Sequence, residues 1–61
     1  MKKRELVKRL GSLGWSFDHH GGNHDIWTNG KICEAVPRHA EIGESLAKKI
    51  LKKAELNPPE R

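Results

Sequence analysis

Apolar residues recur with helical spacing near the start of the chain. Leu6, Leu10 and Leu13 follow one another at intervals of four and three residues, and Val7 stands beside Leu6. On a helix these positions form one apolar stripe. Gly14 comes directly after the stripe, where a glycine commonly ends a helix. The pattern predicts a first helix that ends at Gly14.

A pattern with a period of two residues follows, at residues 15–20. Such alternation is typical of a strand, in which successive side chains point to opposite sides. Trp15, Phe17 and His19 are expected on one side of this strand. Two glycines and an asparagine at 21–23 then predict a tight turn.

Two further strands are predicted on either side of Asn29-Gly30, the strongest short hairpin signal in the chain. The earlier strand runs from His24 to Thr28 and the later one from Lys31 to Val36. Pro37 stops the sheet because it has no N–H to donate to a neighbouring strand. Two tight turns in succession predict a three-stranded antiparallel meander.

The last apolar stripe again has helical spacing and predicts a helix from about Gly43 to Leu56. The stripe consists of Leu46, Ala47, Ile50, Leu51 and Ala54. Each helix has one apolar stripe, so both must cover the same face of the sheet. The predicted fold is therefore α+β, in the order α-β-β-β-α, with the layout of a double-stranded-RNA-binding domain. The other face of the sheet is left to solvent or to a ligand.

The composition predicts a single domain, 1–61, with a thin core. Only 34% of the 61 residues are hydrophobic, and a chain this short rarely gains more than ~3–5 kcal/mol from its core. The single cysteine, Cys33, excludes an internal disulfide and a zinc site built on cysteine pairs. Cys33 is expected in the core, together with Trp15, Phe17 and Trp27. The alternative for the three aromatic residues is stacking on bases. Tight packing or a partner protein must supply the remaining stability.

No apolar run reaches the ~18 or more residues that a membrane span needs. None follows the charged residues Lys2, Lys3 and Arg4 either, as it would in a secretory signal peptide. We expect a cytoplasmic protein that does not bind membranes.

The net formal charge of +4 is distributed unevenly. Residues 1–10 carry five cationic side chains and one glutamate, whereas residues 11–47 carry two cationic and five acidic side chains. Residues 48–61 carry five cationic and two acidic side chains. Two basic ends favour a polyanion as partner.

Four lysines of the predicted last helix sharpen this expectation. They repel one another at i, i+4 spacing, which destabilises a helix by a few tenths of a kcal/mol per pair, and a phosphate backbone would relieve the repulsion. They are Lys48, Lys49, Lys52 and Lys53. The alternative is a solvated face that only aids solubility.

Three of the four histidines, His19, His20 and His24, bracket the turn at 21–23. Histidine is the side chain best suited to move a proton near neutral pH. After a glycine-rich turn, its ring and the nearby backbone amides are open to a phosphate. Such a histidine can take the proton of a 2′-hydroxyl or protonate the leaving oxygen of an RNA backbone. For each of them a plain surface residue is the alternative. A metal site with Asp25 is less favoured, because adjacent His19 and His20 point to opposite faces.

Three motifs in order resemble the HicA family, the toxins of bacterial and archaeal toxin–antitoxin pairs. They are Gly22-Asn23-His24 at the start of a strand, Val36-Pro37-Arg38-His39, and the helix Leu46 to Leu56. The first predicted helix and the Gly14-Trp15 pair after it also fit the family. The resemblance covers about residues 3–57.

The resemblance implies an endoribonuclease that arrests growth by degrading mRNA, and a HicB-type antitoxin that binds and blocks it in a hetero-oligomer. The family's catalytic histidine follows a Gly-Ser pair at the start of the second strand, which is the position of His24 here. Asn23 replaces the usual serine and can still donate and accept a hydrogen bond. The family's Pro-His pair is present as Pro37, Arg38 and His39, so His39 is expected to shape or assist the site.

We therefore expect a metal-independent endoribonuclease without a cofactor. His24 is its catalytic residue, and Asn23, His39 and His20 are the residues able to assist. The lysines expected to hold the RNA backbone are Lys48, Lys49, Lys52, Lys53, Lys3 and Lys8. The alternative from a different class is a non-catalytic module that grips duplex RNA by shape and phosphate contacts. A metal-assisted nuclease is a third possibility, and a chelator would inactivate it.

Overall fold

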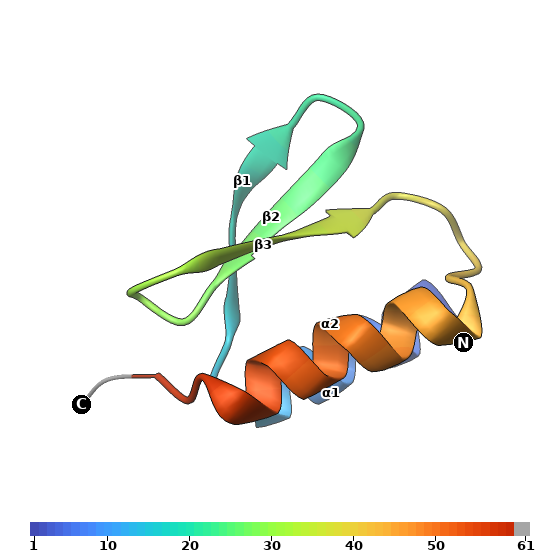
Figure 1. Ribbon diagram of the computed structural model, residues 1–61. Coiled ribbons are helices and arrows are strands. Elements are labelled where there is room, and N and C mark those ends of the chain that lie inside the picture. Colours follow the sequence, from blue (N-terminus) through green and yellow to red (C-terminus); the bar gives the residue numbers. More distant parts are fainter. Residues whose placement is uncertain (60–61) are drawn as a thin grey trace.

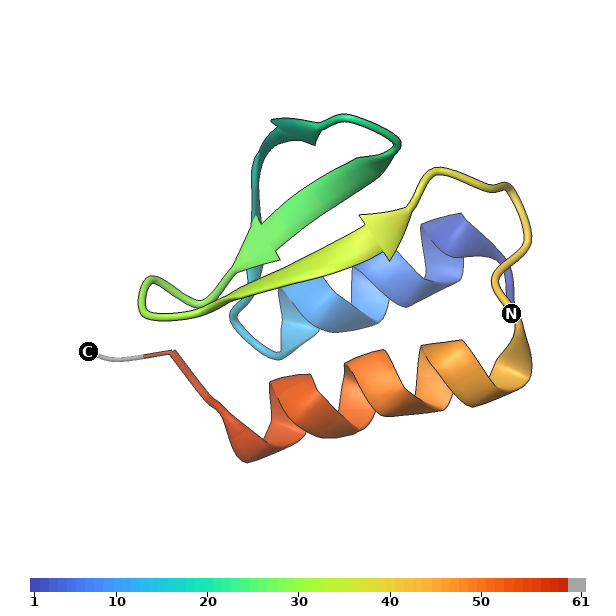
Figure 2. The same cartoon turned by 45° about the horizontal axis from the view of Figure 1, so that its top comes forward.

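The computed structural model describes residues 1–59, which form two layers. The elements are α1 (Lys3–Ser12), β1 (Ser16–Gly21), β2 (His24–Thr28), β3 (Cys33–Pro37) and α2 (Glu44–Leu56). The strands form one antiparallel sheet in the order β1-β2-β3. Both helices lie against the same face of this sheet and side by side (Figures 1 and 2). The predicted α-β-β-β-α fold, like that of a double-stranded-RNA-binding domain, is confirmed.

The first helix ends as its sequence predicts. Leu6 and Leu10 are fully buried, and Leu13 is partly buried against the core. Gly14 has a φ of +90°, a left-handed conformation that favours glycine, and a Cβ there would lie 2.4 Å from Cγ of Pro59. The N–H of Trp15 then donates to the Leu10 carbonyl and leads the chain into β1. A side chain at position 14 is therefore disfavoured both by the backbone conformation and by the closeness of Pro59.

A single apolar core fills the space between the helices and the sheet. Its buried residues are Leu6, Leu10, Trp15, Val36, Ile42, Ala47, Ile50 and Ala54. The stripe predicted for the last helix is correct except at one end, because Leu46 is 41% exposed while Ala47 is fully buried. The buried residues of α2 are Ala47, Ile50 and Ala54, so its inward face has one large side chain between two alanines.

The burial of Asp25 and Val36, which pair across β2 and β3, shows which face of the sheet meets the helices. Residues an odd number of positions away along a strand point the opposite way. His24 is next to Asp25, and Cys33 is three positions before Val36, so both lie on the open face. Cys33 is exposed, and its predicted place in the core is wrong. An apolar neighbourhood in the sequence did not reveal which face this strand position takes.

A β-bulge changes the pattern predicted for the first strand. The register between β1 and β2 shifts between Phe17 and His19, which leaves Asp18 as the extra residue. Phe17 and His20 therefore share a side, with ring centroids 4.9 Å apart. The predicted alternation is therefore wrong beyond Phe17. Phe17 is also 45% exposed, so its predicted burial is wrong. Of the three aromatic residues expected in the core, Trp15 is buried and Trp27 is partly buried against it.

The connection from β2 to β3 is longer than predicted and is held by a buried asparagine. It spans residues 29–32, and β3 begins at Cys33 rather than at Lys31. The Asn29 Oδ1 accepts the N–H groups of Lys31 and Ile32, both at 2.8 Å. Its Nδ2 donates to the Asn57 carbonyl at 2.8 Å, so this turn also fixes the chain beyond α2.

The segment after β3 is tied to the beginning of α1. The N–H of Lys3 donates to the Ala40 carbonyl at 2.9 Å, and the N–H of Ile42 donates to the Met1 carbonyl at 2.8 Å. Figure 2 shows this loop descending from β3 to the start of α2 beside the N-terminal end. Residues 38–42 therefore have a fixed path next to the sheet. Within the described residues, no helix has the length and apolarity to cross a membrane.

Candidate nucleic-acid cleavage site

His24 lies where the β1–β2 turn enters β2. The turn consists of Gly22 and Asn23, and Gly22 has a φ of +56°, as the first residue of a tight hairpin turn requires. His24 is exposed and is paired with Pro37 of β3. The fold therefore brings together two motifs that are about 13 positions apart in the sequence. The turn lies at the end of the sheet away from both helices (Figure 1).

An open hollow is formed by residues of the β1–β2 turn and of the segment after β3, and the His24 side chain is not among its lining residues. It is lined by Asn23, Arg38 and His39 and has a volume of about 360 Å³. We call it the hairpin hollow. Asn23 directly precedes His24, and Arg38 directly follows Pro37, the residue that pairs with His24. The hollow therefore lies beside the His24 backbone. Its size falls in the range of small-molecule sites, ~300–1,000 Å³, and its lining offers an amide, a guanidinium and an imidazole.

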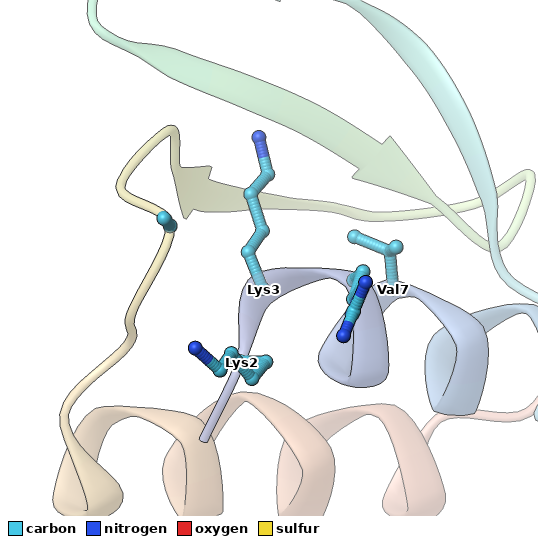
Figure 3. Close-up of a pocket in the computed structure, with 5 residues that line it drawn as sticks. Lys2, Lys3 and Val7 are labelled. Atoms are coloured by element: carbon cyan, nitrogen blue, oxygen red, sulfur yellow. The ribbon is translucent and has the colours of Figure 1, made fainter.

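The carboxylate of Asp25 lies at this end of the sheet, on the face that meets the helices, and has three cationic or ionisable partners. Its Oδ2 accepts from Lys3 Nζ at 2.6 Å, and its Oδ1 accepts from Arg38 Nε at 2.9 Å and contacts His20 Nδ1 at 2.9 Å. We call these four residues the Asp25 cluster. They come from α1, β1, β2 and the segment after β3. Figure 3 shows Lys3 rising from the start of α1 toward the sheet.

Asp25 is only 8% exposed, and a buried carboxylate is tolerated when it is well paired. Its hydrogen bonds with Lys3, then His20 and Arg38, hold the pKa of Asp25 well below its usual range, against the opposing effect of burial. The carboxylate is therefore ionised at neutral pH. Lys3 and Arg38 together outweigh its charge, so the cluster keeps a net positive charge beside the hairpin hollow.

The other histidines have different surroundings. His20 is 70% exposed at its side chain and uses Nδ1 for Asp25, so its Nε2 faces solvent. His19 pairs with Asp18 on the bulge at 2.6 Å. His39 lines the hairpin hollow. Among residues 1–59, no group of three or more histidine, cysteine or acidic side chains is arranged to hold a metal ion.

The lysines predicted to bind RNA are not gathered around His24. The side chains of α2 that face the core are Ala47, Ile50 and Ala54. The exposed lysines 48, 49, 52 and 53 lie on the remaining surface of that helix. Lys53 also pairs with Glu34 of β3 at 3.1 Å.

The two lysines predicted on the first helix differ from each other. Lys8 is exposed on α1. Lys3 is committed to Asp25 and has a side chain only 22% exposed. Lys3 is therefore a structural member of the Asp25 cluster and is not free to contact RNA directly.

A second hollow, of about 480 Å³, lies at the beginning of α1 (Figure 3). Its lining consists of Lys2, Lys3, Arg4, Val7 and Ala40. Lys2 pairs with Glu41 at 3.2 Å, and Lys3 points away to Asp25, so two of its three cations are already neutralised. It contains no residue suited to proton transfer.

The sequence did not single out the Asp25–Arg38 contact. A usable signal existed, because Asp25 and Trp27 are two positions apart in one strand and must face the same side. A charged residue on the inward face of a strand requires a cationic partner. Which cation supplies it depends on segments far away in the chain, so it was visible only in the fold.

Comparison with known protein families gives one family model that covers most of the chain. The family model described as the HicA toxin of bacterial toxin–antitoxin systems matches residues 4–56. Neither the curated proteins nor the solved structures yield a match to the chain. The matched region contains both helices, the sheet, the hairpin hollow and the Asp25 cluster apart from Lys3. The chain belongs to the HicA toxin family and is a toxin of a toxin–antitoxin system.

Proposed function

We propose that this toxin is a metal-independent endoribonuclease that cleaves mRNA, with His24 as its general acid or base. The observation that carries the proposal is the position of His24, exposed at the head of β2 beside a hollow lined by Asn23, Arg38 and His39. The family supports a toxin, and an exposed histidine next in the chain to a hollow lined by an asparagine, an arginine and a histidine supports cleavage of a phosphodiester.

The chemistry requires one proton to leave the ribose 2′-hydroxyl and one proton to reach the leaving 5′-oxygen. The 2′-oxygen forms a bond to phosphorus as the bond from phosphorus to the 5′-oxygen breaks. His24 carries out one of these transfers, which contributes typically ~10²–10⁴-fold. The hairpin hollow holds the phosphate, and Asn23, His39 and His20 are the residues able to assist.

The rest of the RNA lies along basic surface outside the hollow. The exposed lysines of α2 and Lys8 attract the phosphate backbone over several nucleotides. Because they do not surround His24, they contribute to affinity and not to the reaction step. Lys3 supports binding through the Asp25 cluster.

A HicB-type antitoxin is the proposed protein partner, bound in a hetero-oligomer that blocks the site. A toxin–antitoxin family supports an antitoxin in general. The net charge of +4 suits a partner with an acidic surface. Exposed apolar side chains at Phe17, Leu46 and Leu56 offer surface that such a partner can bury.

Induced expression in bacteria tests this proposal. Wild type is expected to stop growth and to remove full-length mRNA, whereas His24→Ala at equal soluble level does neither. His19→Ala is the matched control, because His19 lies on the same hairpin but pairs with Asp18 away from the hollow. Arrest and mRNA loss with His24→Ala would contradict the catalytic assignment.

The fold and the basic face of α2 favour one second function, a module that binds duplex RNA without cleaving it. Purified protein incubated with RNA separates the two. Intact RNA in a stable complex supports the binding module. Cleavage that persists in EDTA supports the metal-independent enzyme, and cleavage abolished by EDTA supports a metal-assisted nuclease.

A further inference from the structure

We infer that Arg38 binds the RNA phosphate in the hairpin hollow through its two terminal nitrogens, and that Asp25 is the positioning residue that aims it. The inference rests on the proposed function, because it names the group that holds the substrate at that site. It adds a phosphate-binding residue and a buried residue that acts through it.

The contacts of Arg38 divide its guanidinium into a fixed part and an open part. Nε donates to Asp25 Oδ1 at 2.9 Å. The terminal nitrogens have no hydrogen-bond partner among residues 1–59, and the side chain is 42% exposed. Arg38 also lines the hairpin hollow. A guanidinium held at Nε presents its terminal N–H groups as a fork, the arrangement that binds a phosphate with two parallel hydrogen bonds.

Asp25 is well built for positioning. It is almost fully buried in β2, and Lys3 fixes its second oxygen at 2.6 Å. Lys3 is itself anchored, because its N–H donates to the Ala40 carbonyl two residues beyond Arg38. The carboxylate and the backbone on both sides of the contact are therefore fixed. Holding a long side chain in place beforehand lowers the entropy lost when it binds a ligand.

Electrostatics and positioning predict opposite changes in RNA affinity for Asp25→Asn. Asp25→Asn removes a negative charge next to the proposed phosphate site, so electrostatics alone predicts tighter RNA binding. Positioning predicts the opposite, because Arg38 loses its charged anchor and its fork is no longer aimed. Weaker binding after removal of an acidic residue would therefore identify Asp25 as a residue that acts through Arg38.

The test measures binding of a fluorescein-labelled single-stranded RNA in the His24→Ala background, where cleavage does not interfere. Arg38→Ala is expected to weaken binding about 10-fold, as the loss of a charge-assisted hydrogen bond does, and to reduce the salt slope by ~0.7. Arg38→Lys is expected to keep the salt slope but to lose most of the RNA affinity that Arg38 contributes, because a lysine lacks the fork. Asp25→Asn is expected to weaken binding about 3-fold or more.

A double-mutant cycle separates positioning from a merely structural role. Adding Asp25→Asn to Arg38→Ala is expected to change RNA affinity no further, since the group that Asp25 aims is already gone. Lys3→Gln is the control, because it removes another partner of the same carboxylate and leaves the Arg38 contact in place. Its effect on RNA affinity is expected to be smaller than that of Asp25→Asn at a similar loss of thermal stability.

The inference is overturned if Arg38→Ala binds RNA as the parent does, or if Asp25→Asn binds more tightly. It is also overturned if Asp25→Asn acts equally with and without Arg38. Should Asp25→Asn fail to fold, Arg38→Lys against Arg38→Ala decides, and equal affinity of Arg38→Lys and the parent contradicts the fork. Loss of cleavage in His24→Ala is scored separately, so the proposed function and this inference fail on different observations.

Discussion

The layer between helices and sheet differs in kind from the end of the sheet that carries His24. Apolar side chains such as Leu6, Leu10 and Val36, all fully buried, hold the first region together. In the second region, one buried carboxylate of β2 holds α1, β1 and the segment after β3 through ion pairs and hydrogen bonds. Substitutions in the first region should therefore act on stability, and substitutions in the second should act mainly on function and on acid sensitivity.

The apolar layer provides the largest expected effect on stability. Leu10→Ala removes a fully buried side chain and should lower the free energy of unfolding by about 2–5 kcal/mol. That is comparable to the ~3–5 kcal/mol expected from the whole core of a domain this small. Urea unfolding followed by tryptophan fluorescence measures it. Leu56→Ala, at a position that is 70% exposed, is the control with an expected change within ~0.5 kcal/mol, and equal losses in the two variants would contradict the assigned core.

The ionic end should make the fold sensitive to acid. The pKa of Asp25 is lower in the folded chain than its ordinary value of 3.8, so the folded state binds fewer protons than the unfolded state in acid. Its contribution to stability is therefore complete above about pH 4 and is lost as the pH falls further. Thermal melts from pH 7 to pH 2 measure this loss. The stability lost between pH 7 and pH 2 should be smaller in Asp25→Asn than in the control Asp18→Asn, because Asp18 is exposed on the bulge. Identical melting profiles of the two variants would refute the role of Asp25.

The lysines of α2 should give the smallest effect, because they lie outside both regions. Replacing Lys49 and Lys52 by glutamine should lower the salt slope of RNA binding by ~1.4, if each contacts one phosphate of a single strand. The cleavage rate at saturating RNA should not change, since neither residue lines the hairpin hollow. Titrations at several salt concentrations measure the slope. An unchanged slope would mean that these lysines are only a solvated face.

The two regions also differ in how far the sequence predicts them. Periodicity predicted both helices and the His24–Thr28 strand, because one stripe or one strand is a local property. It failed after Phe17, because the bulge at Asp18 moves the following residues to the other side. It also failed at Cys33, because the face of a strand position depends on its pairing partner and not on its own polarity.

The candidate site is predicted only in part. Position after a glycine turn, together with the family motifs, pointed to His24, Asn23 and His39, and the fold places Asn23 and His39 in one hollow beside His24. The Asp25 cluster could not be predicted, since its members are separated by up to 35 positions and meet only after the sheet and α1 have packed. Lys3 illustrates this, because its charge indicated RNA contact while the fold commits it to Asp25.

The most direct test of the account is cleavage of a labelled RNA by purified toxin in EDTA under single-turnover conditions. His24→Ala is compared with wild type and with His19→Ala, after thermal melts have shown that all three are equally folded. The account predicts that His24→Ala loses at least ~100-fold in rate while His19→Ala cleaves like wild type. Cleavage by folded His24→Ala at the wild-type rate would contradict the central claim that the ion-paired end of the sheet is a catalytic site built around His24.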